Sequence, residues 1–310
     1  MHEHIARTMY YLSVHLLFAS IVASAAWALT SILRASATTK YWTWVATALN
    51  FVLPLGALID KVWAPYLTWA KPLGAIGDPV WNMTQGLAAV IFGVIWMTGV
   101  VYMVSRLILR ICRERREAEA LAPQSDCGLT SNFLADGIPV SFGDRHRSPA
   151  VRGVLHPRIL LPIGIEQLLN RRELHAVLIH EQAHARRRDN LIRLLYEVSL
   201  CVLWFHPLMW LTGARIGLYR ELSCDESVIR HARGRDLVSA LAKLAVPNQA
   251  GVLQATASSH LSYRLARLAA PPQATYRVAS MLSASLFAAV IAAGIFQTIA
   301  HTACCFVIKH

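Results

Sequence analysis

Four long apolar runs dominate the hydrophobic pattern of the chain and predict membrane-spanning helices. They cover residues 9–33, 41–59, roughly 81–105 and 278–300. A helix needs about 20 consecutive apolar residues to cross a bilayer, and each run meets or nearly meets that length. Pro54 would kink a helix in the second run, which neighbouring helices in a membrane tolerate. The pattern therefore predicts about four transmembrane helices, of which the second is the least regular.

The first run has an alternative interpretation as a cleaved signal peptide. Arg7 precedes it, and Ala23-Ser24-Ala25 resembles a small-residue cleavage site. However, its uncharged span is longer than a usual signal core, and a second apolar run follows after a short loop. These features favour a retained helix.

The segment between the third and fourth runs has a pattern typical of a folded α+β domain. Residues 112–137 begin as a charged helical continuation and break at Pro123 and Gly128, which indicates a linker. From Ile165 onward, apolar residues recur every three or four positions, which predicts helices. Three short runs rich in Val, Ile and Leu predict strands of a small sheet, namely residues 138–143, 150–155 and 158–162.

A shorter apolar run, residues 198–211, lies inside this domain. It is short for a membrane crossing, and Pro207 interrupts it. We expect a hydrophobic hairpin or a kinked helix that lies against the membrane helices. His206 within it is expected to be a packing or interfacial residue rather than a metal ligand.

The composition of the 310-residue chain supports a membrane protein, because 55% of the residues are hydrophobic and only 15% are charged. Positive charge marks the cytoplasmic side of a membrane. Such a cluster follows the third run and consists of Arg106, Arg110, Arg113, Arg115 and Arg116. It predicts that the N-terminus lies outside, residues 106–277 lie in the cytoplasm and the C-terminus lies outside.

These boundaries divide the chain into three parts. We expect an N-terminal membrane domain with three helices at residues 1–111, a cytoplasmic domain at 112–277, and a fourth helix with a short tail at 278–310. The net charge of +12 reflects this topology and attraction to anionic lipid headgroups. The sequence has no nucleic-acid recognition motif, so direct binding to DNA or RNA is not expected. The six cysteines include no CxxC pair, and disulfides are not expected in a reducing cytoplasm.

The sequence HEQAH, from His180 to His184, is the strongest chemical signal in the cytoplasmic domain. Two histidines at positions i and i+4 share one helix face, and Glu181 can reach a water molecule bound between them. A catalytic zinc usually takes three protein ligands and leaves one position for water. Glu221 is the candidate third ligand, because the intervening residues suffice for a helix, a turn and a return helix.

Asp225 lies on the same helix face as Glu221, where it could accept the second ring N–H of a ligand histidine and fix its orientation. From spacing alone, the slightly better interpretation is that both are solvated helix charges paired with Arg220 or Arg230. Their conjunction with HEQAH favours a zinc site instead. Glu181 would then be the general base of metal-assisted peptide hydrolysis.

Other residues near the motif are expected to have structural roles. We expect a helix end that is solvated or faces lipid headgroups at Arg186, Arg187 and Arg188. Asp189 is expected to cap the helix that follows, and Cys224 to be a small core residue. An active site also needs a group that stabilises an oxyanion. Sequence proximity nominates two residues for it, Tyr219 and His231.

Four segments resemble, in order and spacing, the BlaR/MecR-type antirepressor family of membrane zinc metallopeptidases. They are residues 148–162, 174–191, 204–211 and 220–229. The resemblance extends over about residues 10–300 and implies a mainly α integral membrane protein of the bacterial inner membrane. It implies a cytoplasmic gluzincin-type peptidase domain between the third and fourth helices, with His180, His184 and Glu221 as zinc ligands and Glu181 as base. It also implies a link to the loss of a DNA-binding repressor and to the induction of resistance genes.

One departure from the family concerns sensing. The beta-lactam sensors carry a penicillin-binding domain beyond the fourth helix, whereas this sequence ends at His310. We therefore expect no such sensor here, and an input through a separate sensor protein or through the membrane helices. Residues 220–225 also resemble the third-ligand segment of quality-control and CAAX-processing metallopeptidases, which supports Glu221 and leaves the substrate open.

The leading hypothesis is an integral-membrane zinc endopeptidase that cleaves a cytoplasmic regulatory protein. A transcriptional repressor, in a signal-transduction or antibiotic-resistance response, is the first candidate substrate. A non-proteolytic signalling adaptor with a structural zinc site and a membrane-protein quality-control protease are the alternatives. The lipid bilayer, a separate sensor and a homo-oligomer are the further candidate partners.

Overall fold

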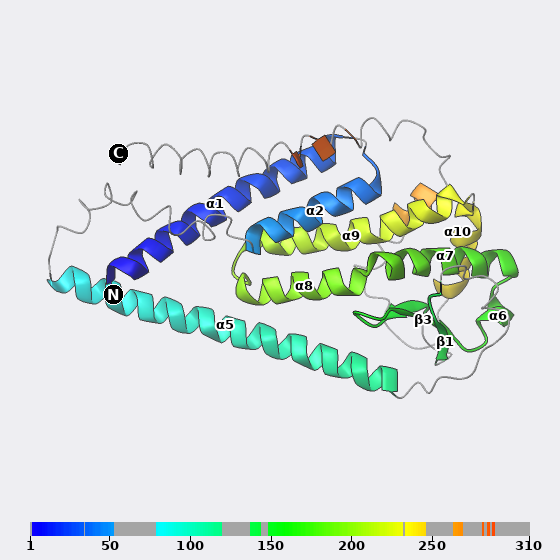
Figure 1. Ribbon diagram of the computed structural model, residues 1–310, viewed down its shortest axis with the longest axis horizontal. Helices are drawn as coiled ribbons and strands as arrows, with labels where there is room; N and C mark the ends of the chain where they lie inside the picture. Colours follow the sequence, from blue (N-terminus) through cyan, green and yellow to red (C-terminus); the bar gives the residue numbers. More distant parts are fainter. Residues whose placement is uncertain are drawn as a thin grey trace.

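Long helices make up most of the structure, and one small sheet lies towards one end (Figure 1). The structure is a computed structural model that describes residues 2–33, 35–52, 79–119, 137–143, 148–231, 233–245 and 263–268, with a few isolated residues between 281 and 288. The helices are α1 (His2–Ile32), α2 (Ala37–Val52), α5 (Pro79–Glu119), α6 (Ile165–Leu168), α7 (Arg171–Arg187), α8 (Asp189–Val202), α9 (Pro207–Arg230) and α10 (Gly234–Ala245). The strands are β1 (Val140–Gly143), β2 (Ala150–Arg152) and β3 (Arg158–Pro162).

Two of the described helices are long and apolar enough to cross a membrane. Residues His15–Ile32 of α1 and Val90–Arg116 of α5 meet that criterion, and they fall on the first and third apolar runs. Between Val90 and Leu109, α5 exposes an apolar surface, where Val94 is 60% and Leu109 is 66% exposed. An apolar surface of this extent is typical of a helix that faces lipid.

The count of four membrane helices stays a prediction. α2 covers only part of the second run, because the described residues end at Val52. The fourth run, 278–300, lies outside the described residues apart from isolated positions, as does the expected linker beyond Glu119.

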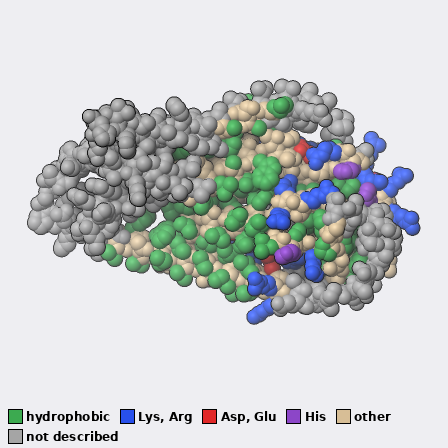
Figure 2. Space-filling model, in the orientation of Figure 1, with side chains coloured by type: hydrophobic (Ala, Val, Ile, Leu, Met, Phe, Trp, Pro, Cys, Tyr) green, Lys and Arg blue, Asp and Glu red, His purple; other side chains and the backbone are tan. Residues whose placement is uncertain are grey.

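Hydrophobic and charged side chains separate along the molecule (Figure 2). Hydrophobic side chains cover the middle of the visible face, whereas Lys, Arg and His gather at the end where the sheet and α10 lie. This separation fits a protein with one part in lipid and the other in water.

The three strands predicted from the sequence form one sheet in the order β1-β3-β2. β1 pairs with β3 in parallel, and β2 pairs with β3 antiparallel, with Val151 opposite Ile159. β2 is shorter than predicted because the backbone turns at Gly153, where φ is +89°. A Cβ at this position would collide with the carbonyl of His156, so only glycine fits.

The core of the sheet end lies between β3, α7 and α10. Ile159 and Leu161 of β3 are fully buried against α7, which contributes Leu178 among others, and Leu237 of α10 closes the other side. This packing fixes α7, the helix that carries HEQAH, against the sheet.

α7 begins with a complete capping box. The Asn170 side chain accepts hydrogen bonds from the backbone N–H groups of Arg172 and Glu173, each at 2.9 Å, and the Asn170 N–H donates to Glu173 Oε2 at 2.8 Å. These bonds satisfy N–H groups that a helix start would otherwise leave unpaired.

Residues 198–211 form a hairpin, one of the two arrangements expected. α8 ends at Val202, α9 begins at Pro207, and the turn between them packs on the apolar helices. The indole N–H of Trp96 on α5 donates to the Val202 carbonyl at 3.0 Å. His206 is a packing residue, as predicted: its ring lies 4.9 Å from that of Phe51 and its Nε2 lies 3.3 Å from Ser20 Oγ.

α2 packs along α9 and joins the N-terminal helices to the rest of the fold. Tyr41 and Trp44 of α2 are fully buried against a cluster that includes Ile216 and Leu222 of α9. Residues from both sides of the boundary expected at residue 111 therefore share one core.

The Glu173 carboxylate should contribute measurably to stability. It is 3% exposed and also accepts hydrogen bonds from Ser239 at 2.6 Å and Lys243 at 2.7 Å on α10. Burial works to raise its pKa, but these donors outweigh burial and hold the pKa below its ordinary value. Glu173→Gln should destabilise the protein by about 1–3 kcal/mol, because Lys243 loses the charged partner of its hydrogen bond.

The apparent melting temperature of detergent-purified protein measures this effect. Glu166→Gln on α6 is the control, because Glu166 is exposed and should leave the melting temperature unchanged. Equal melting temperatures for Glu173→Gln and wild type would contradict the assigned role.

Candidate metal centre

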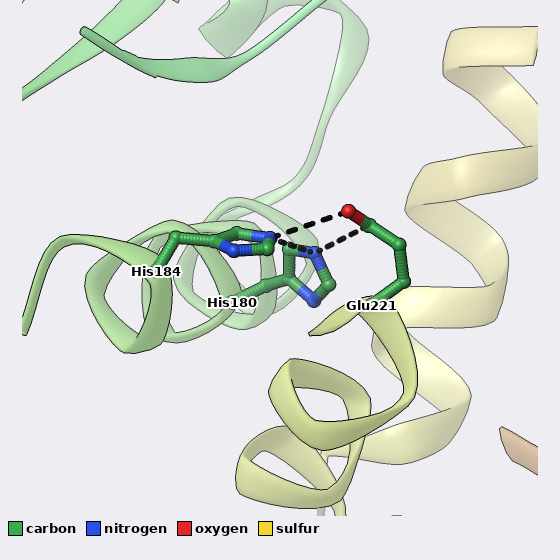
Figure 3. Close-up of side chains that lie close together, drawn as sticks. All are labelled: His180, His184 and Glu221. Atoms are coloured by element: carbon green, nitrogen blue, oxygen red, sulfur yellow. Dashed lines mark hydrogen bonds and ion pairs between the residues drawn. The ribbon is translucent and has the colours of Figure 1, made fainter. Parts of the chain in front are cut away.

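α7 and α9 bring His180, His184 and Glu221 together, with their side chains pointing towards one another (Figure 3). The Nε2 atoms of the two histidines are 3.3 Å apart. Glu221 Oε2 lies 3.6 Å from His180 Nε2, and Glu221 Oε1 lies 3.8 Å from His184 Nε2. The sequence predicted this trio, and the fold assembles it.

The donor atoms of these three residues lie at a spacing that suits a tetrahedral metal ion. An ion about 2.0–2.1 Å from nitrogen or oxygen ligands places those ligands roughly 3.3–3.4 Å from one another. The two histidine nitrogens are 3.3 Å apart, and one oxygen of the Glu221 carboxylate lies 3.6 Å from His180 and the other 3.8 Å from His184, which is close to that spacing. Two imidazoles and a carboxylate are also the ligand types that zinc accepts.

Each histidine turns its second ring nitrogen towards a buried carboxylate. His184 Nδ1 lies 2.6 Å from Asp189 Oδ2, and His180 Nδ1 lies 3.1 Å from Asp225 Oδ1. Both carboxylates are almost fully buried, each with a side chain that is 3% exposed. Such partners fix which ring nitrogen is free to bind a metal.

The sequence identified Asp225 for this position but was wrong about Asp189. Asp189 was expected to cap the next helix, yet the N-cap of α8 is Arg188, which makes no side-chain capping bond. Arg188 has φ 54° and ψ 47°, a left-handed turn that costs about 1 kcal/mol in a residue other than glycine. This turn separates α7 from α8 and lets the Asp189 carboxylate reach back to His184.

Three arginines pair with the carboxylates of the centre. Arg187 donates to both oxygens of Asp189 at 2.6 Å, so the prediction that it is solvated or faces headgroups is wrong. Arg220 donates to Glu221 at 2.9 Å, which is one of the pairings considered for that residue. Arg230 was the other candidate partner, and it instead donates to Ser227.

Arg264 is the third of these arginines, and the sequence analysis did not identify it. It donates to both oxygens of Asp225, at 2.8 and 2.9 Å, and its Nη1 lies 3.2 Å from Glu221 Oε2. Because it comes from a short helical stretch at 263–268, its place at the centre depends on tertiary packing alone.

The charges of Glu221 and His180 are coupled. Burial works to raise the pKa of Glu221, but His180, His184 and Arg220 outweigh it and hold this pKa well below its ordinary value. Burial also disfavours a charged His180, yet Asp225 and Glu221 raise its pKa to about 9. A metal ion that binds His180 must therefore displace a proton.

Asp189 and Asp225 are held ionised in the same way. Burial works to raise both pKa values, but Arg187 holds the pKa of Asp189 below its ordinary value and Arg264 does the same for Asp225. Both groups are thus hydrogen-bond acceptors at neutral pH.

A second group of possible donors, His184, Asp189 and Cys224, also lies close together. Arg187 contacts two of them, because its Nη2 lies 2.6 Å from Asp189 Oδ2 and 3.2 Å from Cys224 Sγ. Burial raises the pKa of the Cys224 thiol, so this sulfur keeps its proton. Cys224 is a fully buried core residue, as expected.

A cavity of about 430 Å³ opens beside the trio. Glu181, which is 8% exposed, lines it together with the two histidines and Glu221. The outer strand β2 forms one further wall, with Ala150 and Val151. An apolar face of α10 forms another, with Leu237, Leu241 and Leu244. Among the described lining residues, neither Tyr219 nor His231 is present, so the structure does not bring the nominated oxyanion groups to this cavity.

Apolar helices and a His-His-Glu group with metal-binding spacing, of which Glu221 is partly exposed, define the class of a metallopeptidase-like membrane protein. The comparison with protein families agrees. The chain belongs to the BlaR1 peptidase M56 family, whose model matches residues 11–268. Members of this family are membrane-associated and depend on a metal.

Individual relatives match at low identity. The methicillin resistance protein MecR1 of Staphylococcus aureus is 25% identical over 104 residues, and the regulatory protein BlaR1 of Bacillus licheniformis is 28% identical over 147 residues. The matched segments cover 34% and 45% of this chain, but only 18% and 24% of the two relatives. The chain thus matches less than a quarter of the length of each of these proteins.

Asp225→Asn should weaken metal binding at this centre, with Zn²⁺ as the probe, about 10- to 100-fold, because Asn holds the ring of His180 less firmly and no longer balances the charge of Arg264. Competition with a chromogenic chelator, on detergent-purified protein, measures the affinity. Asp236→Asn is the control, since Asp236 is a partly exposed residue of α10 paired with Arg233. Wild-type affinity in Asp225→Asn would show that His180 is not held through this carboxylate.

Proposed function

We propose that this protein is an integral-membrane zinc endopeptidase that cleaves a cytoplasmic regulatory protein. The observation that carries the proposal is the convergence of His180 Nε2, His184 Nε2 and the Glu221 carboxylate at tetrahedral spacing, beside a cavity that Glu181 also lines. Three candidate ligands and a candidate base around one cavity support a metallopeptidase mechanism.

His180, His184 and Glu221 would hold the zinc ion. Asp189 and Asp225 orient the two imidazoles through their second nitrogens. A bound zinc ion supplies a Lewis acid that acidifies water and polarises a carbonyl group.

Glu181 is the general base of the reaction. It takes a proton from the attacking water while a bond forms between the water oxygen and the peptide carbonyl carbon. It then delivers this proton to the amide nitrogen as the C–N bond breaks, so that one peptide bond and one water molecule become a carboxylic acid and an amine.

The cavity walls suit an extended peptide. β2 is an outer strand, paired only with β3 among the described strands, and an extended segment can add to such an edge. Asn190 Nδ2 donates to the carbonyls of Val151 and Gly153, each at 3.0 Å, and so ties β2 to the start of α8. The leucines of α10 on the other wall favour an apolar side chain in the substrate.

The arginine cluster of α5 supports a cytoplasmic position for the cavity. Arg110, within this cluster, pairs with Glu197 of α8, and Glu197 also accepts from Arg193 at 3.0 Å. Arg193 lines the cavity. The cavity therefore lies at the positively charged end of α5, which is the cytoplasmic end by the distribution of charge.

The relatives favour a regulatory substrate. The matched proteins are named as a regulatory protein and a methicillin resistance protein. A DNA-binding repressor is the candidate substrate, because its cleavage would convert a membrane signal into a change in transcription.

Glu181→Gln should keep the metal and abolish cleavage. Loss of the base alone lowers the rate of peptide hydrolysis about 10²- to 10⁴-fold. Purified Glu181→Gln protein should still bind zinc like wild type. Quantitative proteomics of N-termini, comparing cells that express wild type or Glu181→Gln, should find protein fragments that require Glu181.

Glu166→Gln is the matched control and should process substrate like wild type. Fragments of one regulator support the proposal, and fragments from many misfolded membrane proteins would point to quality control. Equal processing by wild type and Glu181→Gln would refute the peptidase mechanism and favour an adaptor that acts by binding.

A further inference from the structure

The carboxylate of Asp189 is held by residues from two distant parts of the chain. Besides His184 and Arg187, it contacts Tyr41 of α2, whose hydroxyl donates to Asp189 Oδ1 at 3.0 Å. Tyr41 belongs to the N-terminal apolar helices, far from the HEQAH segment in sequence. We call the predicted domain at residues 112–277 the peptidase half. A helix outside it thus reaches the carboxylate that orients a candidate metal ligand.

Tyr41 contacts the metal centre in two ways. Its side chain is fully buried, and the guanidinium carbon of Arg187 lies 4.3 Å from the centre of its ring. A cation over an aromatic face is attracted to it. The ring therefore holds Arg187 while the hydroxyl holds Asp189, and these two residues are themselves joined by a bidentate ion pair.

The start of α2 has a second link to the same residues. Thr38 Oγ1 lies 2.9 Å from Ser223 Oγ, and Ser223 Oγ accepts a hydrogen bond from Arg187 at 2.6 Å. Glu226 of α9 also accepts from the backbone N–H of Ala37 at 2.7 Å, which fixes the first turn of α2 against α9. Two separate hydrogen-bonded paths thus join α2 to Arg187 and Asp189.

These contacts have a consequence for His184. Its Nδ1 lies 2.6 Å from Asp189 Oδ2, and this hydrogen bond holds the ring with Nε2 facing Glu221 and His180. An acceptor that rotates freely orients an imidazole poorly, whereas one fixed by several donors orients it well. The hydroxyl of Tyr41 is one of those donors.

We propose that Tyr41 of α2 is a positioning residue of the metal centre, so that the outer shell of the metal is shared between the N-terminal apolar helices and the peptidase half. The inference rests on the proposed function, because it takes His184 as a metal ligand. It adds that residues 112–277 do not hold a complete site by themselves.

The test is Zn²⁺ affinity in the full-length protein, measured in detergent by competition with a chelator. Tyr41→Phe removes the hydroxyl and keeps the ring beside Arg187. We expect the affinity to weaken about 3- to 10-fold, less than the roughly 10- to 100-fold loss expected for Asp189→Asn.

Tyr196→Phe is the matched control. The side chain of Tyr196 is also partly buried, and its hydroxyl donates to the Met209 carbonyl at 2.8 Å rather than to Asp189. Both Tyr→Phe variants should lower the melting temperature of the zinc-free protein by similar amounts. Only Tyr41→Phe should bind zinc more weakly, which separates a positioning role from a general structural one.

The outcomes distinguish the inference from the function on which it rests. Wild-type affinity in Tyr41→Phe, together with weakened binding in Asp189→Asn, would overturn the positioning role and leave the peptidase proposal intact. Wild-type affinity in both Asp189→Asn and His184→Ala would refute the metal centre itself. If Tyr41→Phe does not fold, Thr38→Val cuts the second path at its α2 end without removing a ring: weaker zinc binding supports an outer shell shared with α2, and unchanged binding overturns it.

Discussion

Buried negative charge around two histidines is the constraint on which the rest of the structure depends. Asp189, Glu221 and Asp225 all lie at the metal centre, and an unpaired carboxylate in such a position would cost several kcal/mol. Each is instead paired with an arginine, namely Arg187, Arg220 and Arg264. These arginines come from the end of α7, from α9 and from residues 263–268. The carboxylates of the candidate centre are therefore all paired only when these three segments of the chain have packed together. The arrangement of the candidate metal ligands thus depends on the tertiary fold.

The N-terminal helices take part in this closure. α2 buries Tyr41 and Trp44 against α8 and α9, and Glu226 of α9 accepts hydrogen bonds from the backbone N–H groups of Ala37 and Thr38 at the start of α2. A carboxylate at this end of a helix satisfies N–H groups that have no partner within the helix. The interface between the apolar helices and the peptidase half is thus made of both core packing and hydrogen bonds, and the same helix that forms it supplies a donor to the metal centre.

The sequence predicts those features that depend on local periodicity. HEQAH places two histidines on one helix face, the Val-Ile-Leu runs give the three strands, and Pro207 marks the break between α8 and α9, because each follows from the geometry of neighbouring residues. Arg187 was within reach of the same reasoning, since it lies three residues after His184 and therefore on the face of the ligands. Asp189 was not, because its direction depends on a left-handed turn at Arg188 that no residue type there signals. Arg264 and Tyr41 have no local signal either, and only the packing of distant segments brings them to the site.

A metal centre that includes a donor from α2 is sensitive to where that helix lies. The Tyr41 hydroxyl is 3.0 Å from Asp189, and a shift of α2 by about 1 Å away from it would break the hydrogen bond. α5 contacts the peptidase half differently, through the pair of Arg110 with Glu197 and through Trp96 at the tip of the α8–α9 hairpin. Those contacts end at the outer side of α8 and do not include a residue that binds His180, His184 or Glu221. Among the described apolar helices, α2 therefore provides the shortest path by which a displacement of these helices would reach the candidate metal ligands.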